Sequence, residues 1–364
     1  DLLERRWLTN DGPYVREFER KVADLAGVEH AVAVCNATAA LELTVRALGW
    51  HGEVLLPSFT FIATAHALRW QGITPVFCDV DPRTHNLDPK EVERAVTPRT
   101  TGIIGVHVWG RPCEVEALEE IAQRRGLGLI FDAAHALGCS AGGRSIGGFG
   151  QAEIFSFHAT KIVNSSEGGV IVTRSPDLAE KLRRMRNFGF LGEDVVDGLG
   201  TNAKMPEVCA VMGLGSLETL DEWVAVNLRN YQNYQAELHG LKGIELVPYD
   251  LSEKNNYQYV VVEIEGPPDG RTRDRIRDVL RAENVVARRY FHPGCHRLEP
   301  YVSEASTTGR PLPETERLAA RVLALPTGTA VGEAEIHSIA DILRVCAENA
   351  ESLAAARLPQ PATA

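Results

Sequence analysis

Residues 155–173, FSFHATKIVNSSEGGVIVT, consist of two apolar runs separated by a polar segment. Each apolar run is short and hydrophobic throughout, which is typical of a strand covered on both faces. The polar segment carries one lysine, Lys161, five residues after Ser156. A loop lysine is usually solvated, but a lysine kept from water has a lowered pKa and can act as a nucleophile. The stretch alone leaves both interpretations open.

Apolar runs of the same kind alternate with helical patterns from about residue 30 to residue 189. The strand-like runs are HAVAV, EVLLP, PVFCDVD, TGIIGVHVWG, LGLIFD, EIFSF and GGVIVT. Because such strands need helices on both faces of their sheet, the alternation predicts an α/β fold with a mainly parallel sheet sandwiched by helices. We expect this large domain to span residues 1–234, including an N-terminal arm.

The pattern changes after Asn202, where one or two long helices follow. Beyond them, YQYVVVEIEG predicts a strand, RTRDRIRDVLRAENV a helix and VARRYF a second strand. The segment EAEIHSIADILRVCAENAESLAAARL predicts a C-terminal helix. Strand, helix, strand and helix in succession predict a smaller α+β domain over residues 235–364.

Composition excludes several classes of protein. The formal net charge of −11 and the absence of any run of Lys and Arg argue against a nucleic-acid-binding protein. Seven scattered cysteines without a C-x-x-C pair indicate reduced thiols rather than a disulfide framework. No apolar run approaches the ~20 residues of a membrane span, and the first residues do not resemble a signal peptide. We therefore expect a cytoplasmic protein that binds neither nucleic acid nor membrane.

Polar residues follow three of the predicted strands: Asn36 to Thr38, Asp132 and Lys161. Ligands of such sheets bind outside the carboxyl ends of the strands. Asp132 ends the apolar run LGLIFD, where an unpaired carboxylate would be costly, although it could equally cap a short helix at AAHALG. An amine and a carboxylate at the ends of two strands of one sheet are what pyridoxal 5'-phosphate (PLP) requires: a lysine for a Schiff base, and an acid that keeps the pyridine nitrogen protonated.

A phosphate-bearing cofactor also needs an anion site, and CNATAALEL predicts a helix whose N-terminus can supply one. Thr38 could add a hydroxyl donor there, or serve as an ordinary N-cap. Ser156 is a second possible donor, or a hydroxyl satisfied in the core. Phe61, in PSFTFIAT, could lie on the pyridine ring or pack in the core.

Five motifs in this order resemble the PLP-dependent nucleotide-sugar aminotransferases of the DegT type, which are fold-type I enzymes. The motifs are NATAALEL, PSFTFIATA, FDAAHALG, SFHATK followed by EGG, and TNAKMPEVCAVMGL, and the resemblance runs from about Trp7 to the C-terminal helix. It implies that Lys161 forms the Schiff base and that Asp132 contacts the pyridine nitrogen. The other cofactor contacts it implies are His135 at the ring substituents, Phe61 stacked on the ring, and Thr38, Ala39 and Ser156 at the phosphate.

The resemblance also implies an assembly and a reaction. Asn202 matches an asparagine lent by the neighbouring subunit to the cofactor phosphate, so we expect a homodimer with shared active sites. Related sugar dehydratases carry His where this chain has Lys161, which favours transamination. PLP would pass through its pyridoxamine 5'-phosphate form during turnover, with glutamate or glutamine as amino donor.

The segment FHATKIVNSSEGG resembles relatives that act at the 4-position of the sugar. The expected substrate is a dTDP-4-keto-6-deoxyhexose, converted to a 4-amino-4,6-dideoxy sugar for natural-product or cell-surface glycan biosynthesis. A 3-keto sugar or a keto-inositol is the alternative. Asn187, Tyr290 and His292 are expected substrate contacts, and the residues that bind the diphosphate are left open among Arg186, Asn187 and the segment ARRYFHPGCH.

Three functions from other classes have weaker signals. A dehydrogenase would need G-x-G-x-x-G opening a helix, whereas GGRSIGGFG opens none. A metal-dependent hydrolase could be built on His292, Cys295 and His296, but no paired ligands accompany them, so no metal is expected. A regulator that keeps only the fold would need a DNA-binding module, for which the chain has neither room nor charge.

Overall fold

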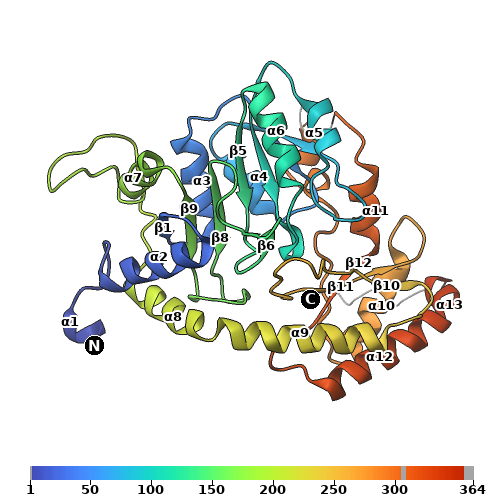
Figure 1. The fold of residues 1–364 in the computed structure, drawn as a ribbon. Coiled ribbons are helices and arrows are strands. Elements are labelled where there is room, and N and C mark those ends of the chain that lie inside the picture. The colour runs from blue at the N-terminus through green and yellow to red at the C-terminus, as the bar shows by residue number, and fades with distance from the viewer. Residues whose placement is uncertain (1, 305–308, 356–364) are drawn as a thin grey trace, which may run out of the picture.

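A seven-stranded sheet forms the centre of the computed structural model, which describes residues 2–304 and 309–355 (Figure 1). In spatial order its strands are β1 (His30–Val34), β9 (Gly169–Thr173), β8 (Ala152–Ser156), β5 (Gly128–Asp132), β4 (Thr100–Val106), β2 (Glu53–Pro57) and β3 (Thr74–Cys78). Only β9 runs antiparallel to its neighbours, β1 and β8. The other pairs are parallel, which confirms the predicted mainly parallel sheet.

Helices cover both faces of this sheet, and alternate residues of each strand point to opposite faces. Leu129 and Phe131 of β5 pack into one core, whereas Ile130 packs into the other. The first core contains side chains of α2 (Pro13–Ala26), α5 (Pro89–Ala95), α6 (Val115–Arg125) and α8 (Glu207–Glu218). The second contains side chains of α3 (Ala37–Ala47), α4 (Ile62–Arg69) and α7 (Pro176–Met185). Burial on both faces explains why these strands are apolar throughout.

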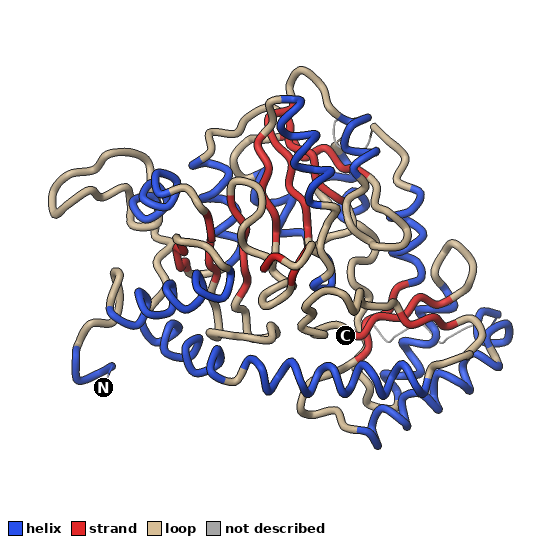
Figure 2. The backbone as a smooth tube through the Cα atoms, viewed as in Figure 1, coloured by secondary structure: helices blue, strands red, loops and turns tan. Residues whose placement is uncertain are grey.

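Helix α9 (Leu220–Glu237) follows α8 and leads from the large sheet to a second, smaller one (Figures 1 and 2). This antiparallel sheet has the order β10 (Ile244–Leu246), β11 (Val260–Ile264) and β12 (Val322–Leu325). Side chains of α9, α10 (Arg271–Ala282) and α12 (Glu333–Glu348) form its core. The predicted domain boundary after residue 234 falls inside α9 and stays a prediction.

The prediction of a strand at VARRYF is wrong. That segment forms only an isolated bridge between Arg288 and Ala324, and the third strand of the small sheet is β12, directly after α11 (Pro313–Arg321). The chain turns instead of extending, because the N–H of His292 bonds to the carbonyl of Arg289 and the ring of Phe291 stacks against that of Trp109.

The remaining elements are short. They are α1 (Leu2–Arg5), β6 (Ser140–Ala141), β7 (Arg144–Ser145), α13 (Ala350–Ala355), and the 3₁₀ turns η1 (Val108–Gly110), η2 (Cys295–Arg297) and η3 (Tyr301–Ser303). Among the helices of the described residues, none combines the length and hydrophobicity that a membrane span requires.

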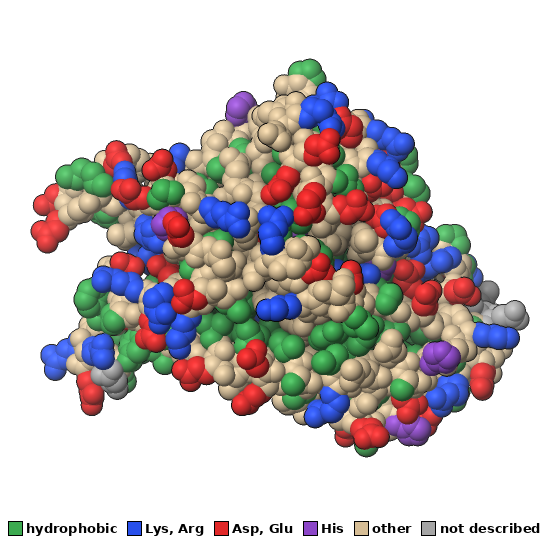
Figure 3. All heavy atoms as spheres, viewed as in Figure 1, with side chains coloured by type: hydrophobic (Ala, Val, Ile, Leu, Met, Phe, Trp, Pro, Cys, Tyr) green, Lys and Arg blue, Asp and Glu red, His purple; other side chains and the backbone are tan. Residues whose placement is uncertain are grey.

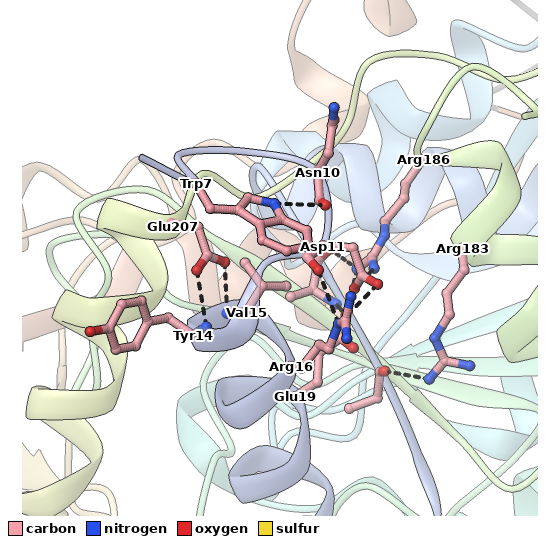
Figure 4. A network of polar contacts seen from close by, with 12 residues as sticks. Trp7, Asn10, Asp11, Tyr14, Val15, Arg16, Glu19, Arg183, Arg186 and Glu207 are labelled. Carbon is pink, nitrogen blue, oxygen red and sulfur yellow. Dashed lines mark hydrogen bonds and ion pairs between the residues drawn. The ribbon is translucent and has the colours of Figure 1, made fainter. Parts of the chain in front are cut away.

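The start of α2 is tied to α8 by a buried carboxylate (Figure 4). Glu207 accepts hydrogen bonds from the backbone N–H groups of Tyr14 and Val15, at 3.0 and 2.9 Å. A carboxylate at this position satisfies free N–H groups of the helix and interacts favourably with its dipole. The N-terminal segment is thus fixed to the helix that follows the large sheet.

Arg186 lies in the same region and is almost fully buried (Figure 4). Its guanidinium forms ion pairs with Glu19 and Asp11 and donates to the carbonyl of Ala33 at 2.7 Å. Because these partners hold it inside the fold, Arg186 is not placed to meet a substrate diphosphate in this chain, and its role is structural.

Candidate active site

A cavity of about 610 Å³ lies at the carboxyl ends of the large sheet. Residues that end or follow five strands line it: Asn36 and Thr38 after β1, Thr60 and Phe61 after β2, Val106 in β4, Asp132 in β5, and Ser156 and Lys161 at β8. Parallel strands bring these ends to one edge. Tyr259, Arg288, Tyr290 and Phe291 close the cavity from the side of the small sheet.

Lys161 lies in the connection between β8 and β9, and the loop that carries it is held at several points. The N–H of Ser165 bonds to the carbonyl of Phe157 at 2.8 Å, and the N–H of Ile162 bonds to the side chain of Gln258 at 3.1 Å. The amine itself donates to the hydroxyl of Tyr259 at 3.3 Å. Burial lowers the pKa of Lys161 to about 8, against the opposing effect of Asp132. A usable fraction of the amine is therefore neutral near pH 7.

Asp132 is a buried carboxylate with neutral partners only. Its Oδ2 accepts from the hydroxyl of Thr64 at 2.8 Å, and its Oδ1 accepts from the N–H of Ala134 at 3.1 Å. No residue in the described part of the chain forms an ion pair with it. Burial raises the pKa of Asp132 above its usual range, although these hydrogen bonds oppose the shift. The carboxylate can accept a further, cationic donor, which would lower its pKa.

His135 lines the cavity between aromatic rings. Its Nδ1 accepts from the backbone N–H of Trp109 at 3.2 Å, and its ring centre lies 4.4 Å from that of Tyr259. Burial holds the pKa of His135 well below its usual value, so the ring is neutral near pH 7. Since Nδ1 is an acceptor, the hydrogen bond assigns the proton to Nε2, which makes His135 a neutral donor.

The N-terminus of α3 opens onto the cavity beside the end of β8. Asn36 caps the helix by accepting from the N–H of Ala39 at 2.8 Å. Thr38 and Ser156 line the cavity, whereas Ala39 does not. The N–H of Ala39 is bonded to the cap. Phe61 lines the cavity and is 59% exposed, so its ring is not packed in the core.

Three other predicted residues do not line this cavity. Asn187 and Asn202 pair with each other in a bridge after α7, and Asn202 is expected to act in a neighbouring subunit. His292 contacts the carbonyl of Ala319 at 3.2 Å, while Tyr290 does line the cavity. These assignments stay predictions.

The three candidate metal ligands of the segment HPGCH contact different groups. Nδ1 of His296 lies 2.7 Å from the hydroxyl of Ser58, and the thiol of Cys295 donates to the carbonyl of Thr60 at 3.3 Å. His292 lies beside α11. Within residues 2–304 and 309–355 no three His, Cys, Asp or Glu side chains are arranged to hold a metal ion.

Sequence reasoning missed Thr64 and Tyr259 and did not single out Arg288. Thr64 is one of several small residues in a helical pattern, so nothing marks it as the partner of Asp132. Tyr259 begins an apolar strand and is separated from Lys161 by 98 positions. Arg288 belongs to the segment ARRYFHPGCH, within which the sequence distinguishes no single residue for the diphosphate.

Comparison with known proteins gives one family across nearly the whole chain. The model of the DegT/DnrJ/EryC1/StrS aminotransferase family matches residues 1–344. A dTDP-4-amino-4,6-dideoxy-D-glucose transaminase of Shigella dysenteriae is 35% identical over 327 residues, 89% of this chain and 88% of the relative. A UDP-N-acetyl-3-dehydro-alpha-D-glucosamine 3-aminotransferase of Acidithiobacillus ferrooxidans is 34% identical, over 90% of this chain and 87% of the relative. The crystal structure of DesI with its TDP-sugar product is 54% identical, with a TM-score of 0.92, and covers 97% of this chain and 90% of that one.

Proposed function

This chain belongs to the DegT/DnrJ/EryC1/StrS aminotransferase family, and we propose that it transfers an amino group from glutamate or glutamine to a dTDP-4-keto-6-deoxyhexose. The product is a 4-amino-4,6-dideoxy sugar. The observation that carries the proposal is the pair formed by the half-buried Lys161 and the buried Asp132 on the wall of one cavity. The relative from Shigella dysenteriae and the DesI structure with a TDP-sugar support the substrate class.

The residues of the cavity fit PLP. An amine of lowered pKa at Lys161 suits a covalent link to an aldehyde. Asp132, a buried carboxylate with neutral partners only, suits the protonated pyridine nitrogen. The N-terminus of α3 with Thr38 and Ser156 suits the phosphate. When bound, PLP supplies an electron sink that stabilises negative charge at the carbon next to the amine.

The proton transfers are assigned to Lys161. Its Nζ takes the proton from the α-carbon of the amino donor, and in the second half-reaction it delivers a proton to the sugar carbon. A base with a pKa of about 8 can do both near neutral pH. Tyr259 accepts a hydrogen bond from Nζ and so holds the amine on the side of the small sheet when the lysine is free.

Two further groups would support the bound cofactor. Asp132 would hold a proton on the pyridine nitrogen, and His135 offers Nε2–H as a neutral donor. The rings of Trp109, Tyr259 and Phe291 pack around His135 and exclude water from this side of the cavity. Exclusion of water strengthens these electrostatic interactions.

A homodimer with shared active sites, in which Asn202 reaches the neighbour's cofactor phosphate, is part of the proposal. Support comes from exposed apolar side chains on α8, namely Val208, Val211 and Met212, and from Phe188 and Phe190 in the loop before Asn202. Figure 3 shows hydrophobic side chains gathered in a band across one face of the molecule. Exposed apolar surface of this kind is typical of an interface. A cytoplasmic location is proposed from seven cysteines that form no disulfide.

The position of the new amine can be tested against its alternatives. The 3-aminotransferase of Acidithiobacillus ferrooxidans supports a 3-keto sugar as the second candidate, and a keto-inositol is the third. Protein loaded with PLP is first converted by glutamate or glutamine, and the pyridoxamine form is followed by absorbance. The three ketone classes are then added singly, and product masses are measured, with Lys161→Ala as the inactive control. Conversion of a 3-keto sugar or a keto-inositol in preference to the 4-keto sugar would refute the substrate assignment, and failure to form the pyridoxamine form would refute transamination.

A further inference from the structure

Arg288 projects from a fixed backbone position into the lining of the active-site cavity. Its N–H donates to the carbonyl of Ala324 in β12 at 2.9 Å, and its carbonyl accepts from the N–H of Ala324 at 2.8 Å. Its guanidinium forms no hydrogen bond or ion pair with any residue the structure describes. The next residue, Arg289, differs in this respect, since it pairs with both carboxylate oxygens of Asp274 at 3.1 and 3.0 Å.

The other basic side chains of the cavity are less suited than this guanidinium to bind an anionic ligand. Lys161 has a lowered pKa and is the residue assigned to the cofactor, and His135 is neutral. His158 is exposed and bonds to the hydroxyl of Thr160 at 2.9 Å. Arg288 is therefore the guanidinium in the described lining of the cavity that has no protein partner.

Both substrates of the proposed reaction carry anionic oxygens, the amino donor in its carboxylates and the keto sugar nucleotide in its diphosphate. A guanidinium binds either group through two parallel hydrogen bonds. We propose that Arg288 binds the anionic oxygens of the substrates in this cavity, an inference that rests on the proposed function. The two hydrogen bonds to β12 fix the backbone, so the long side chain can meet an anion at the mouth without movement of the sheet.

A binding experiment tests this inference without turnover. PLP-loaded wild-type protein and the variants Arg288→Gln, Arg288→Lys and Arg281→Gln are titrated calorimetrically with dTDP and, separately, with 2-oxoglutarate. Arg281 is a matched control because it is exposed on α10, lies outside the cavity and has no side-chain partner among the described residues. PLP content, measured by absorbance, shows that each variant is folded.

We expect Arg288→Gln to weaken the binding of at least one ligand by roughly 10- to 100-fold, the usual effect of a lost charge-assisted hydrogen bond. Arg288→Lys should recover part of the loss, because it keeps the charge but not the two-pronged geometry, and Arg281→Gln should bind as wild type does. The ligand whose binding is weakened shows whether Arg288 binds a diphosphate or a carboxylate. Unchanged binding of both ligands by Arg288→Gln, equal weakening by Arg281→Gln, or no binding of either by wild type would overturn the inference. The proposed function is judged separately, by turnover of the wild-type protein on the ketone panel.

Discussion

Replacement of Thr64 by Val removes one of the two hydrogen bonds to the carboxylate of Asp132 and keeps the shape of the side chain. The lost bond, from the Thr64 hydroxyl to Oδ2 at 2.8 Å, is buried. A hydrogen bond to a charged group contributes about 1.5–3 kcal/mol, and one to a neutral group about 0.5–1.5 kcal/mol. Because the bond favours the ionised form of Asp132 more than the neutral form, its loss raises the pKa of this carboxyl further.

The sign of the effect on stability follows from the direction of the shift. Burial already raises the pKa of Asp132 in the folded protein, so the folded state holds this proton more tightly than the unfolded chain. The stability that the raised pKa of Asp132 contributes is fully present below the pKa that this residue has in the unfolded chain. It is lost as the pH rises through the pKa of Asp132 in the folded protein. Thr64→Val therefore destabilises the cofactor-free protein most at high pH, by about 1.5–3 kcal/mol, and least at low pH, by about 0.5–1.5 kcal/mol.

Urea unfolding of the cofactor-free protein between pH 4.5 and pH 8.5 measures this difference. Thr44→Val is the matched control, because the hydroxyl of Thr44 is also buried but donates at 2.7 Å to the neutral carbonyl of Ala40, away from the cavity. The control should lose a constant amount of stability at every pH. The reasoning is refuted if Thr64→Val also loses the same amount at every pH, because the hydroxyl would then not act on an ionised carboxylate.

Three further perturbations have definite outcomes. In cofactor-free protein, modification of Lys161 by an amine-directed reagent, mapped by mass spectrometry, should rise with pH with a midpoint at about pH 8; a midpoint near that of an exposed lysine would contradict the shielded environment of the amine. Tyr259→Phe should keep PLP but slow the proton transfer from α-deuterated glutamate by about tenfold in single turnover, since the amine loses its hydrogen-bond acceptor; an unchanged rate and isotope effect would exclude the role. Glu207→Gln should weaken the cap on Tyr14 and Val15 by about 0.5–2 kcal/mol and speed proteolysis before α2, whereas wild-type protease resistance would show that the carboxylate is dispensable.

The parts of the site that the sequence predicts are those that follow from strand order. Asp132 and Lys161 could be placed together because each comes directly after an apolar run, and parallel strands end at one edge of the sheet. The apolar runs themselves are visible because both faces of the sheet are buried. Local pattern is sufficient for such features.

Contacts between distant segments were not predictable in this way. Tyr259 meets Lys161 only because α9 leads the chain to the small sheet and β11 starts beside the cavity. The segment VARRYF has a strand-like composition, yet the packing of Phe291 on Trp109 turns it away from the sheet. The first contact has no signal in the local sequence, and in the second case tertiary packing outweighs the local preference for a strand.

The anchored connection between β8 and β9 has a stereochemical consequence. Because the backbone of Lys161 is a fixed pivot, its amine can travel only by rotation about the bonds of its own four-carbon stem, within a radius of about 6 Å. The amine therefore approaches every reacting carbon from one side. A proton delivered from one side to a planar sugar carbon forms a single configuration at that carbon, so the handedness of the amino sugar is set by which face the bound ketone turns towards Lys161.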